Sequence, residues 1–453
     1  MTIRTFRSGG VSARIVHADS LDYLAGLPDA SIDAVITDPP YGLAELKPGR
    51  VVQAIEAWAR GERDFVPDGR GFMGVPWDSF VPPPAIWDEC LRVLKPGGHL
   101  AAFAGSRTYD IMGLAVRMAG FEIRDGLVWL YGQGMPKGQK VGRAVHAQAL
   151  RRGGSEEAAV AAADRWDGWD TTLKPAHEPI VLARKPLAER TVAANLLEHG
   201  AGGLHVDAIR VQHRCVADVE ESAAKNRHGD FGRNHGMNVL YGDYSALGAR
   251  VSHDVARGRH PANLILSHAP DCRQVGVATV ASNTHHPARR GTGGIASSGH
   301  AGQDGLVEHR PGSEQVEEWE CAPGCPVAGI DEGTGVRRGG RSVGGASRFF
   351  HTTEAAAPFV YAGKPKPWER PSYVDEDGKR VHHVSVKPLA VMDYLVRMLT
   401  PAGGVVLDPF AGSGTTVESA LRCGFDAIGV EREAEYLPLI EQLMRRIDRS
   451  TAA

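Results

Sequence analysis

Four consecutive residues, Asp38-Pro39-Pro40-Tyr41, place a carboxylate, two stiff prolines and an aromatic ring directly after an apolar run. That run, residues 32–37, has the composition of a buried strand. Because proline fixes φ and lacks a backbone donor, the carbonyl groups here are left free to accept hydrogen bonds. A carboxylate, a free carbonyl and a flat ring suit a planar exocyclic amine, and nucleobases carry such amines. The alternative is an ordinary turn after a strand, since Asp and Pro are common turn residues.

A second motif lies near the C-terminus, where an apolar run ends at Asp408 and a glycine-rich turn, Pro409–Thr416, follows. Strand, glycine-rich turn and helix open a nucleotide-binding βαβ unit, and Gly412 and Gly414 let the backbone approach a ligand. A P-loop would need a Lys before Ser or Thr, and a dinucleotide fingerprint would need a third Gly three residues after the second. Glu431, 19 residues after Gly412, stands near the offset of a carboxylate that grips ribose hydroxyls. We therefore expect a ribose-bearing ligand without a pyrophosphate.

Together the two motifs resemble those of the amino-methyltransferases that use S-adenosylmethionine. The target-amine motif comes first and the cofactor motif last, which resembles the permuted β class of DNA amino-methyltransferases. The resemblance implies that Asp38, Pro39, Pro40 and Tyr41 hold the target amine. It also implies a cofactor site formed by Asp19, Lys387, Asp408, Phe410, Gly412, Gly414, Thr415 and Glu431.

Within that resemblance, Asp19 would contact the cofactor adenine and Lys387 would lie at its methionine end. Residues 132–137 resemble the loop beside the extruded base. The chain departs from the family pattern at Val384 and Val386, where Pro and Gln are more usual. The start of a helix is therefore an alternative reading of residues 385–387.

The fold class that we expect is α/β, with a Rossmann-like, mostly parallel sheet of about seven strands and helices on both sides. The apolar spacing predicts strands at 15–19, 99–104, 121–129 and 176–183, and helices at 87–94, 390–399 and 416–421. Residues 1–185 and 375–453 would build this sheet from both chain ends. Residues 186–374 would form a loop-rich insertion in the place of the family's target-recognition domain. A shorter insertion at 47–76 would either close over the bound base or be disordered.

Metal-ligand spacing occurs inside the insertion. His268 and Cys272 form a His-x3-Cys pair, and Cys321 and Cys325 form a Cys-x3-Cys pair about 49 residues later. Four such ligands could close a tetrahedral structural zinc site. The alternative is that His268 and Cys272 cap a turn while Cys321 and Cys325 are reduced thiols or form a disulfide. A disulfide is disfavoured in the cytosol.

Composition gives little direct sign of the partner. The 453 residues are 42% hydrophobic and 23% charged, with a net charge of −3. Residues 186–374 carry 20 basic and 20 acidic side chains, so a DNA-binding face must be local, and the arginine-rich stretch 250–310 is one candidate. No apolar run reaches 18 residues and no secretory signal opens the chain, so no membrane contact and a cytoplasmic location are expected.

The function expected from these features is methyl transfer from S-adenosylmethionine to N6 of adenine in a specific double-stranded DNA sequence. Base flipping would deliver the amine for direct in-line transfer. The acid form of the target motif resembles that of adenine enzymes, and Tyr41 favours DNA over RNA. Alternatives are cytosine N4 methylation, an RNA adenine target, a small-molecule or protein amine, and a non-catalytic DNA-binding protein. Carbon methylation is disfavoured because no Pro-Cys dipeptide occurs. The recognition sequence, a homodimer and a restriction partner are left open.

Overall fold

The computed structural model describes most of the chain outside residues 211–262 and 283–311. The described residues are 1–43, 47–69, 71, 76–130, 138–173, 175–210, 263–267, 273–282, 312–321, 336–338, 341–343, 351–353, 369–383 and 385–450. The chain divides into two compact units. We call Met1–Ala208, Asn263–Pro270 and Thr353–Ala453 the core unit, and Ile209–Ala262 with Asp271–Thr352 the insertion unit. The insertion unit thus begins and ends inside the interval 186–374.

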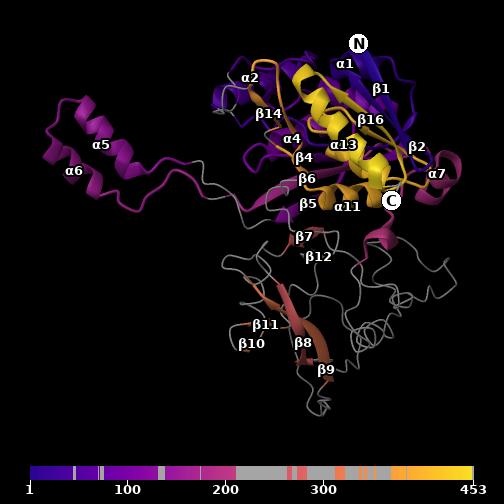
Figure 1. Ribbon diagram of the computed structural model, residues 1–453. Helices are drawn as coiled ribbons and strands as arrows, with labels where there is room; N and C mark the ends of the chain where they lie inside the picture. The colour runs from indigo at the N-terminus through magenta and orange to yellow at the C-terminus, as the bar shows by residue number, and fades with distance from the viewer. Residues whose placement is uncertain are drawn as a thin grey trace, which may run out of the picture. The chain divides into compact units, whose positions relative to one another are not determined.

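A large mixed sheet dominates the core unit (Figure 1). Its strands within the core unit are β1 (Thr2–Ser8), β2 (Val11–His17), β3 (Ile32–Thr37), β4 (Leu94–Phe103), β5 (Glu122–Leu130), β6 (His177–Arg184), β7 (Leu264–Ser267), β15 (Val405–Asp408) and β16 (Asp426–Glu431). The last strand of the sheet, β12 (His351–Thr353), spans the boundary between the two units in the sequence. Their order across the sheet is β1-β2-β16-β15-β3-β4-β6-β5-β7-β12. The seven strands from β2 to β5 in this order correspond to the expected sheet, and β1, β7 and β12 lengthen it to ten.

The pairing directions confirm a mostly parallel sheet built from both ends of the chain. Strands β2, β16, β15, β3 and β4 run parallel to their neighbours in this series, whereas β6 is antiparallel to both β4 and β5. The C-terminal strands β15 and β16 lie between the N-terminal strands β2 and β3. In register, Leu407 pairs with Val35 and Gly429 pairs with Ile15.

Helices cover both faces of this sheet, as expected for an α/β fold. They are α1 (Ser20–Ala25), α2 (Pro48–Ala59), α3 (Pro84–Val93), α4 (Tyr109–Met118), α7 (Val192–His199), α11 (Leu389–Leu399), α12 (Thr415–Arg422) and α13 (Leu437–Ser450). Two further helices, α5 (Val141–Arg151) and α6 (Glu156–Asp164), pack on each other and do not cover the sheet. Short 3-10 turns occur at η2 (Pro76–Asp78), η3 (Val206–Ile209) and η7 (Ala434–Tyr436). Helix α3 packs on α1 and α4, and α12 packs on α11 and α13. Figure 1 shows α13, in yellow, crossing in front of the sheet beside β16.

Apolar, β-branched strands form the centre of the core. All six residues of β3 are buried, and it has a paired strand on each side. Such continuous burial is typical of parallel strands covered on both faces. Trp58 of α2 and Trp87 of α3 are among the largest fully buried side chains. Helix α2 is therefore an ordered, packed element within the 47–76 insertion.

The expected elements match the observed ones to within a few residues, and the largest differences are that β2 begins at Val11 instead of residue 15 and β4 at Leu94 instead of residue 99. A further hairpin, β13 (Ser372–Val374) with β14 (Arg380–His382), leads into α11. In the insertion unit, β8 (Arg273–Ser282), β9 (Gly312–Glu320), β10 (Val336–Arg338) and β11 (Arg341–Val343) form an antiparallel sheet in the order β10-β11-β9-β8. The sequence did not predict this sheet. No helix in the described ranges is long and apolar enough to cross a membrane.

Candidate active site

Four acidic residues stand at the carboxyl ends of four neighbouring parallel strands. Asp19 follows β2, Glu431 ends β16, Asp408 ends β15 and Asp38 follows β3. Carboxyl ends of parallel strands meet at one edge of the sheet, where such folds bind ligands. The structure therefore brings the two distant motifs of the sequence to a single edge, in the spatial order Asp19, Glu431, Asp408, Asp38.

Asp38 is held through one of its two carboxylate oxygens. Its Oδ2 accepts hydrogen bonds from Lys387 Nζ at 2.6 Å and from Ser385 Oγ at 2.9 Å. Its Oδ1 is buried and has no hydrogen-bond partner among the described residues. A buried carboxylate oxygen without a partner is costly, so this atom is suited to accept an N–H group from a ligand.

Lys387 lies in a buried, aromatic and acidic environment just before α11. Its Nζ is 3.5 Å from Glu178 Oε2 and 5.2 Å from the ring centroids of both Tyr41 and Phe103. Burial lowers the pKa of Lys387, but the neighbouring charges of Asp38 and Glu178 outweigh it and the net pKa is raised. Lys387 is therefore a permanent cation at neutral pH.

Tyr41 is fixed at both its backbone and its hydroxyl. Its backbone oxygen accepts a hydrogen bond from Thr108 Oγ1 at 2.7 Å, and its Oη donates to Glu178 Oε2 at 2.8 Å. Burial raises the pKa of Tyr41 well above 10, and the charges of Asp38 and Glu178 raise it further. The phenol thus stays neutral, and its ring is held against the Lys387 ammonium.

Asp408 is a structural partner of the target motif. Its Oδ1 accepts hydrogen bonds from Thr37 Oγ1 at 2.6 Å and from the Phe410 backbone N–H at 3.0 Å. Burial raises the pKa of Asp408 to about 6, against the opposing hydrogen bonds of Thr37 and Thr416. The bond to Thr37 ties the end of β15 directly to the residue before Asp38.

The glycine-rich turn is shaped by Glu431. Its Oε2 accepts the Gly412 backbone N–H at 2.7 Å, and its Oε1 accepts the Glu433 backbone N–H at 2.8 Å. Burial raises the pKa of Glu431 to about 7 despite these bonds. Gly412 has φ +53° and Gly414 has φ +89°, a region that side chains rarely adopt. A Cβ at Gly414 would come within 2.7 Å of Ile440.

An aromatic group lines the other side of this turn. His383 packs edge-on against Tyr436 at 4.7 Å between centroids and lies parallel to Trp77 at 6.3 Å. A Cβ at Gly412 would meet His383 Nε2 at 2.9 Å, so only glycine fits there. Burial lowers the pKa of His383 to about 4, and its Nδ1 accepts the Ser385 N–H at 3.3 Å. The neutral ring therefore carries its hydrogen on Nε2, beside the turn.

The remaining predicted residues occupy varied positions. Asp19 is exposed, and its Oδ1 caps α1 by accepting the Leu21 N–H at 2.9 Å. Phe410 packs beside Trp87 with 6.4 Å between ring centroids, and Thr415 is buried with its hydroxyl 3.0 Å from that of Ser413. Pro39 is buried and Pro40 is partly exposed between Asp38 and Tyr41.

Most of the metal prediction lies outside the described residues. Of the four expected ligands only Cys321 is described, where it is partly exposed; His268, Cys272 and Cys325 are not. Within the described part of the chain, no group of three or more His, Cys, Asp or Glu side chains could hold a metal ion. The structural zinc site stays a prediction. Residues 132–137, the expected base-side loop, and Val384 also lie outside the described part.

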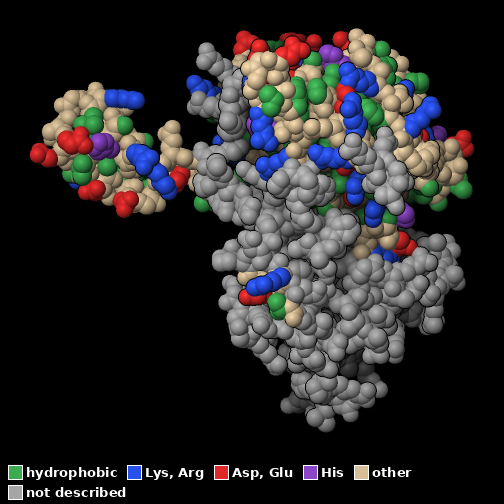
Figure 2. Space-filling model, viewed as in Figure 1, with side chains coloured by type: hydrophobic (Ala, Val, Ile, Leu, Met, Phe, Trp, Pro, Cys, Tyr) green, Lys and Arg blue, Asp and Glu red, His purple; other side chains and the backbone are tan. Residues whose placement is uncertain are grey.

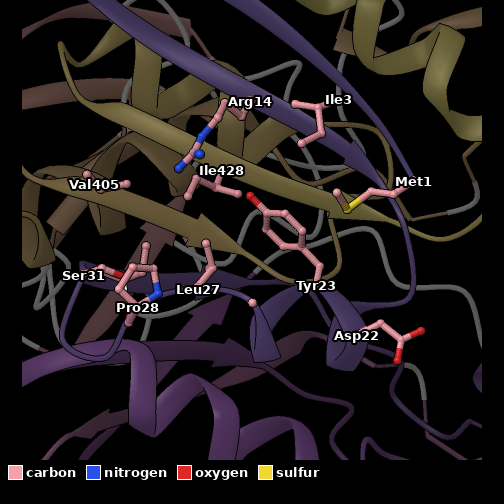
Figure 3. A pocket seen from close by; sticks show the side chains of 12 residues that line it. Met1, Ile3, Arg14, Asp22, Tyr23, Leu27, Pro28, Ser31, Val405 and Ile428 are labelled. Carbon is pink, nitrogen blue, oxygen red and sulfur yellow. Dashed lines mark hydrogen bonds between the residues drawn. The ribbon is translucent and has the colours of Figure 1, made fainter.

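A pocket of about 590 Å³ lies elsewhere on the core unit (Figure 3). It is bordered by α1 and by the amino ends of β3 and β15, and Tyr23, Arg14 and Ile428 project into it. These strand ends are opposite the edge that carries Asp38 and Asp408. The pocket is thus separate from the candidate active site.

Sequence reasoning did not identify several residues of the site. Glu178, Thr37, Trp77 and His383 contribute contacts there, and Ser385 was read only together with Lys387. Thr37 directly precedes Asp38, so its position was a usable signal. Glu178 follows His177 at the start of β6, and nothing in the local pattern connects it with Tyr41, because the contact spans 137 residues.

The strand order, the acidic strand ends and the glycine-rich turn define a Rossmann-like methyltransferase fold of the α/β class. Residues 352–442 match the N6/N4 methyltransferase family model, which is described as DNA methylase. The resemblance to the S-adenosylmethionine-dependent DNA amino-methyltransferases is thereby confirmed.

Similar proteins include two bacterial type II methyltransferases. M.HinfI of Haemophilus influenzae is 38% identical over 73 residues, which are 16% of this chain and 20% of that protein. M.ScaI of Streptomyces caespitosus is 38% identical over 61 residues, 14% of this chain and 20% of that protein. The chain thus spans about a fifth of the length of these relatives.

Solved structures with a similar chain include a DNA modification methylase from Thermus thermophilus. It is 15% identical, covers 95% of this chain and 94% of its own, and has a TM-score of 0.36. The PvuII cytosine-N4-specific DNA methyltransferase is 12% identical, covers 97% of this chain and 91% of its own, and has a TM-score of 0.38.

Proposed function

We propose that this protein transfers a methyl group from S-adenosylmethionine to N6 of adenine in a specific sequence of double-stranded DNA. The observation that carries the proposal is the state of Asp38. One of its oxygens is anchored by Lys387 and Ser385, while the other is buried without a described partner at the sheet edge shared with Asp408. An exocyclic amine of a flipped base would satisfy that oxygen.

The residues of the target motif divide the chemical work between them. The neutral ring of Tyr41 offers a face on which an extruded base can stack. Asp38 Oδ1 accepts one amine hydrogen and the Pro39 carbonyl accepts the other, which directs the nitrogen lone pair away from both. Positive charge that develops on the nitrogen then lies beside the Asp38 carboxylate, which stabilises it electrostatically. Pro40 keeps the segment stiff.

The turn at Gly412–Gly414 fits a cofactor that needs close approach of the backbone. Both glycines have positive φ, and a Cβ at either would collide with His383 or Ile440. S-adenosylmethionine supplies a methyl group already activated on a sulfonium. Glu431 would hold the ribose, Asp19 the adenine and Lys387 the methionine end, with Asp408, Phe410 and Thr415 shaping the turn. Alignment of donor and acceptor in one crevice supplies several kcal/mol, roughly, of the barrier reduction.

Double-stranded DNA is the proposed partner. The relatives named above are type II methyltransferases, which supports this assignment. Because the net charge is −3, any DNA-binding face must be local. Figure 2 shows Lys and Arg side chains spread over the visible face of the core unit, with Asp and Glu along its upper rim. We further propose that residues 186–374 read the target sequence and that the protein acts in the cytoplasm.

The test is methylation of unmodified genomic DNA with S-adenosylmethionine labelled in its methyl group, followed by nucleoside analysis. We expect label in N6-methyldeoxyadenosine and none in the cytosine fraction. Label only in N4-methyldeoxycytidine would replace adenine with cytosine as the target. Absence of label in every DNA fraction, with cofactor bound, would favour a non-catalytic DNA-binding protein.

A further inference from the structure

We propose that Glu178 is a positioning residue for methyl transfer, which acts through Tyr41 and Lys387. This inference rests on the proposed function and deepens it. Neither Glu178 nor its strand belongs to the target motif or to the glycine-rich turn. It is nevertheless the residue that connects the ring and the ammonium of the site.

A single oxygen of Glu178 makes both connections. Its Oε2 lies 2.8 Å from Tyr41 Oη and 3.5 Å from Lys387 Nζ. Glu178 is the second residue of β6, where it pairs with Trp129 of β5, and β6 is bonded on its other side to β4. The pairing with β4 begins two residues later, at Ile180, so Glu178 projects from the start of a strand that is anchored on both sides.

The ring of Tyr41 is oriented by this contact. Thr108 holds the Tyr41 backbone oxygen, and Glu178 holds the phenol oxygen at the far end of the side chain. With both ends bonded, rotation of the ring is restricted before any base arrives. Such preorganisation lowers the cost of stacking a base on the ring.

Charge provides the second part of the role. Lys387, Asp38 and Glu178 have side-chain exposures of 6%, 15% and 21%, so one ammonium and two carboxylates share a mostly buried space. If Glu178 were neutral, Lys387 would offset the charge of Asp38 alone and the group would carry no net charge. With Glu178 ionised, the group keeps one net negative charge, the sign that favours positive charge on the reacting amine.

Three variants separate the two contributions. Glu178→Gln keeps an oxygen that can accept the Tyr41 hydrogen bond but removes the charge. Tyr41→Phe removes the hydrogen bond and keeps the charge, and the double variant removes both. Exposed Glu189, on the loop after β6, supplies the matched control Glu189→Gln.

Steady-state transfer to DNA is the first measurement. We expect Glu178→Gln to lower kcat roughly ten- to hundredfold, the range of a hydrogen bond or ion pair to a charged group. The dissociation constant for S-adenosylmethionine and the melting temperature should match those of the Glu189→Gln control. The double variant should lose less than the product of the two single losses, because both act on Tyr41.

An unchanged kcat in Glu178→Gln, beside an active wild-type protein, would overturn the role of Glu178. Wild-type protein that transfers no methyl group at all would instead overturn the proposed function.

An ultraviolet titration tests the coupling without any need for activity. The difference between proteins with and without Tyr41→Phe isolates the titration of Tyr41. Glu178→Gln should move that titration to lower pH, because a negative charge that opposes phenolate formation has been removed. A Tyr41 titration unaltered by Glu178→Gln would show that the two side chains are not coupled, and would end the proposal.

Discussion

Lys387 Nζ lies 2.6 Å from Asp38 Oδ2, although 349 residues separate the two in sequence. The contact joins a residue that precedes α11 to the target motif that follows β3. It occupies one oxygen of the carboxylate, whereas the other is buried without a hydrogen-bond partner among the described residues. The Lys387 ammonium therefore fixes the orientation of the Asp38 carboxylate and also offsets part of the negative charge of that carboxylate.

Replacement of Asp38 by Asn should abolish most methyl transfer. The shape is kept, but the negative charge beside the reacting amine is lost, which costs roughly two to three orders of magnitude in kcat. Cofactor affinity, measured by calorimetry, should change only a few-fold, because Asp38 follows β3 and is not part of the glycine-rich turn. Full activity in Asp38→Asn would disprove the assigned role of this carboxylate.

Gly412→Ala should weaken cofactor binding. The backbone there has φ +53°, and the new Cβ would lie 2.9 Å from His383 Nε2, so the turn must shift. Strain of this kind costs about 1–3 kcal/mol, which corresponds to roughly a ten- to hundredfold weaker affinity if the bound form must adopt the native turn. Equilibrium binding of S-adenosylmethionine measures the effect.

Gly424 provides the control for that substitution. It has φ +83° with open space around its Cβ position, and it follows α12 away from the turn. Gly424→Ala should lower stability slightly and leave cofactor affinity unchanged. Equal losses of affinity in both variants would show that backbone strain in general, and not the contact at His383, governs binding.

The buried carboxyl group of Glu418 should make stability depend on pH. Burial raises its pKa to about 7, so the folded protein binds this proton more tightly than the unfolded chain does. The stabilising contribution is complete below about pH 4.5 and disappears as pH rises through about 7. Glu418→Gln should therefore gain stability relative to wild type between about pH 5 and pH 8, by an amount on the order of 1–3 kcal/mol.

Chemical denaturation of wild type and Glu418→Gln at about pH 5 and about pH 8 measures this difference in the free energy of unfolding. Glu189→Gln, which alters an exposed carboxylate, should show no comparable trend. A stability difference between wild type and Glu418→Gln that stays constant with pH would mean that Glu418 titrates normally.

Asp33→Ala should destabilise the junction between the two ends of the chain. Asp33 is buried, its Oδ1 binds Lys95 Nζ at 2.6 Å, and its Oδ2 accepts the Val405 N–H at 2.9 Å. Truncation leaves the backbone donor of β15 without this partner and should cost about 2–4 kcal/mol in the free energy of unfolding. The exposed Asp64→Ala should stay within about 0.5 kcal/mol of wild type. A similarly small effect of Asp33→Ala would show that this bond is dispensable.

The elements that position the site were largely predictable. Strands such as β3 and β15 are short apolar runs followed by or ending in Asp, and their periodicity and boundaries can be read locally. The contacts that complete the site could not be read this way. Glu178 reaches Tyr41 only because β6 turns antiparallel beside β4, and sequence spacing does not encode that pairing. The insertion sheet was also missed, because its strands are separated by glycine-rich segments without clear periodicity.

Because β15 and β16 are inserted between β2 and β3, the order of synthesis differs from the order in space. On the ribosome, β2 and β3 emerge several hundred residues before the strands that pair with them. Until then their edges are unsatisfied, and a chain that stops before residue 405 retains an open gap in the middle of its sheet. Truncated products should consequently depend on chaperones or be degraded, and the nascent protein would acquire its candidate site only when nearly all of the polypeptide has been made.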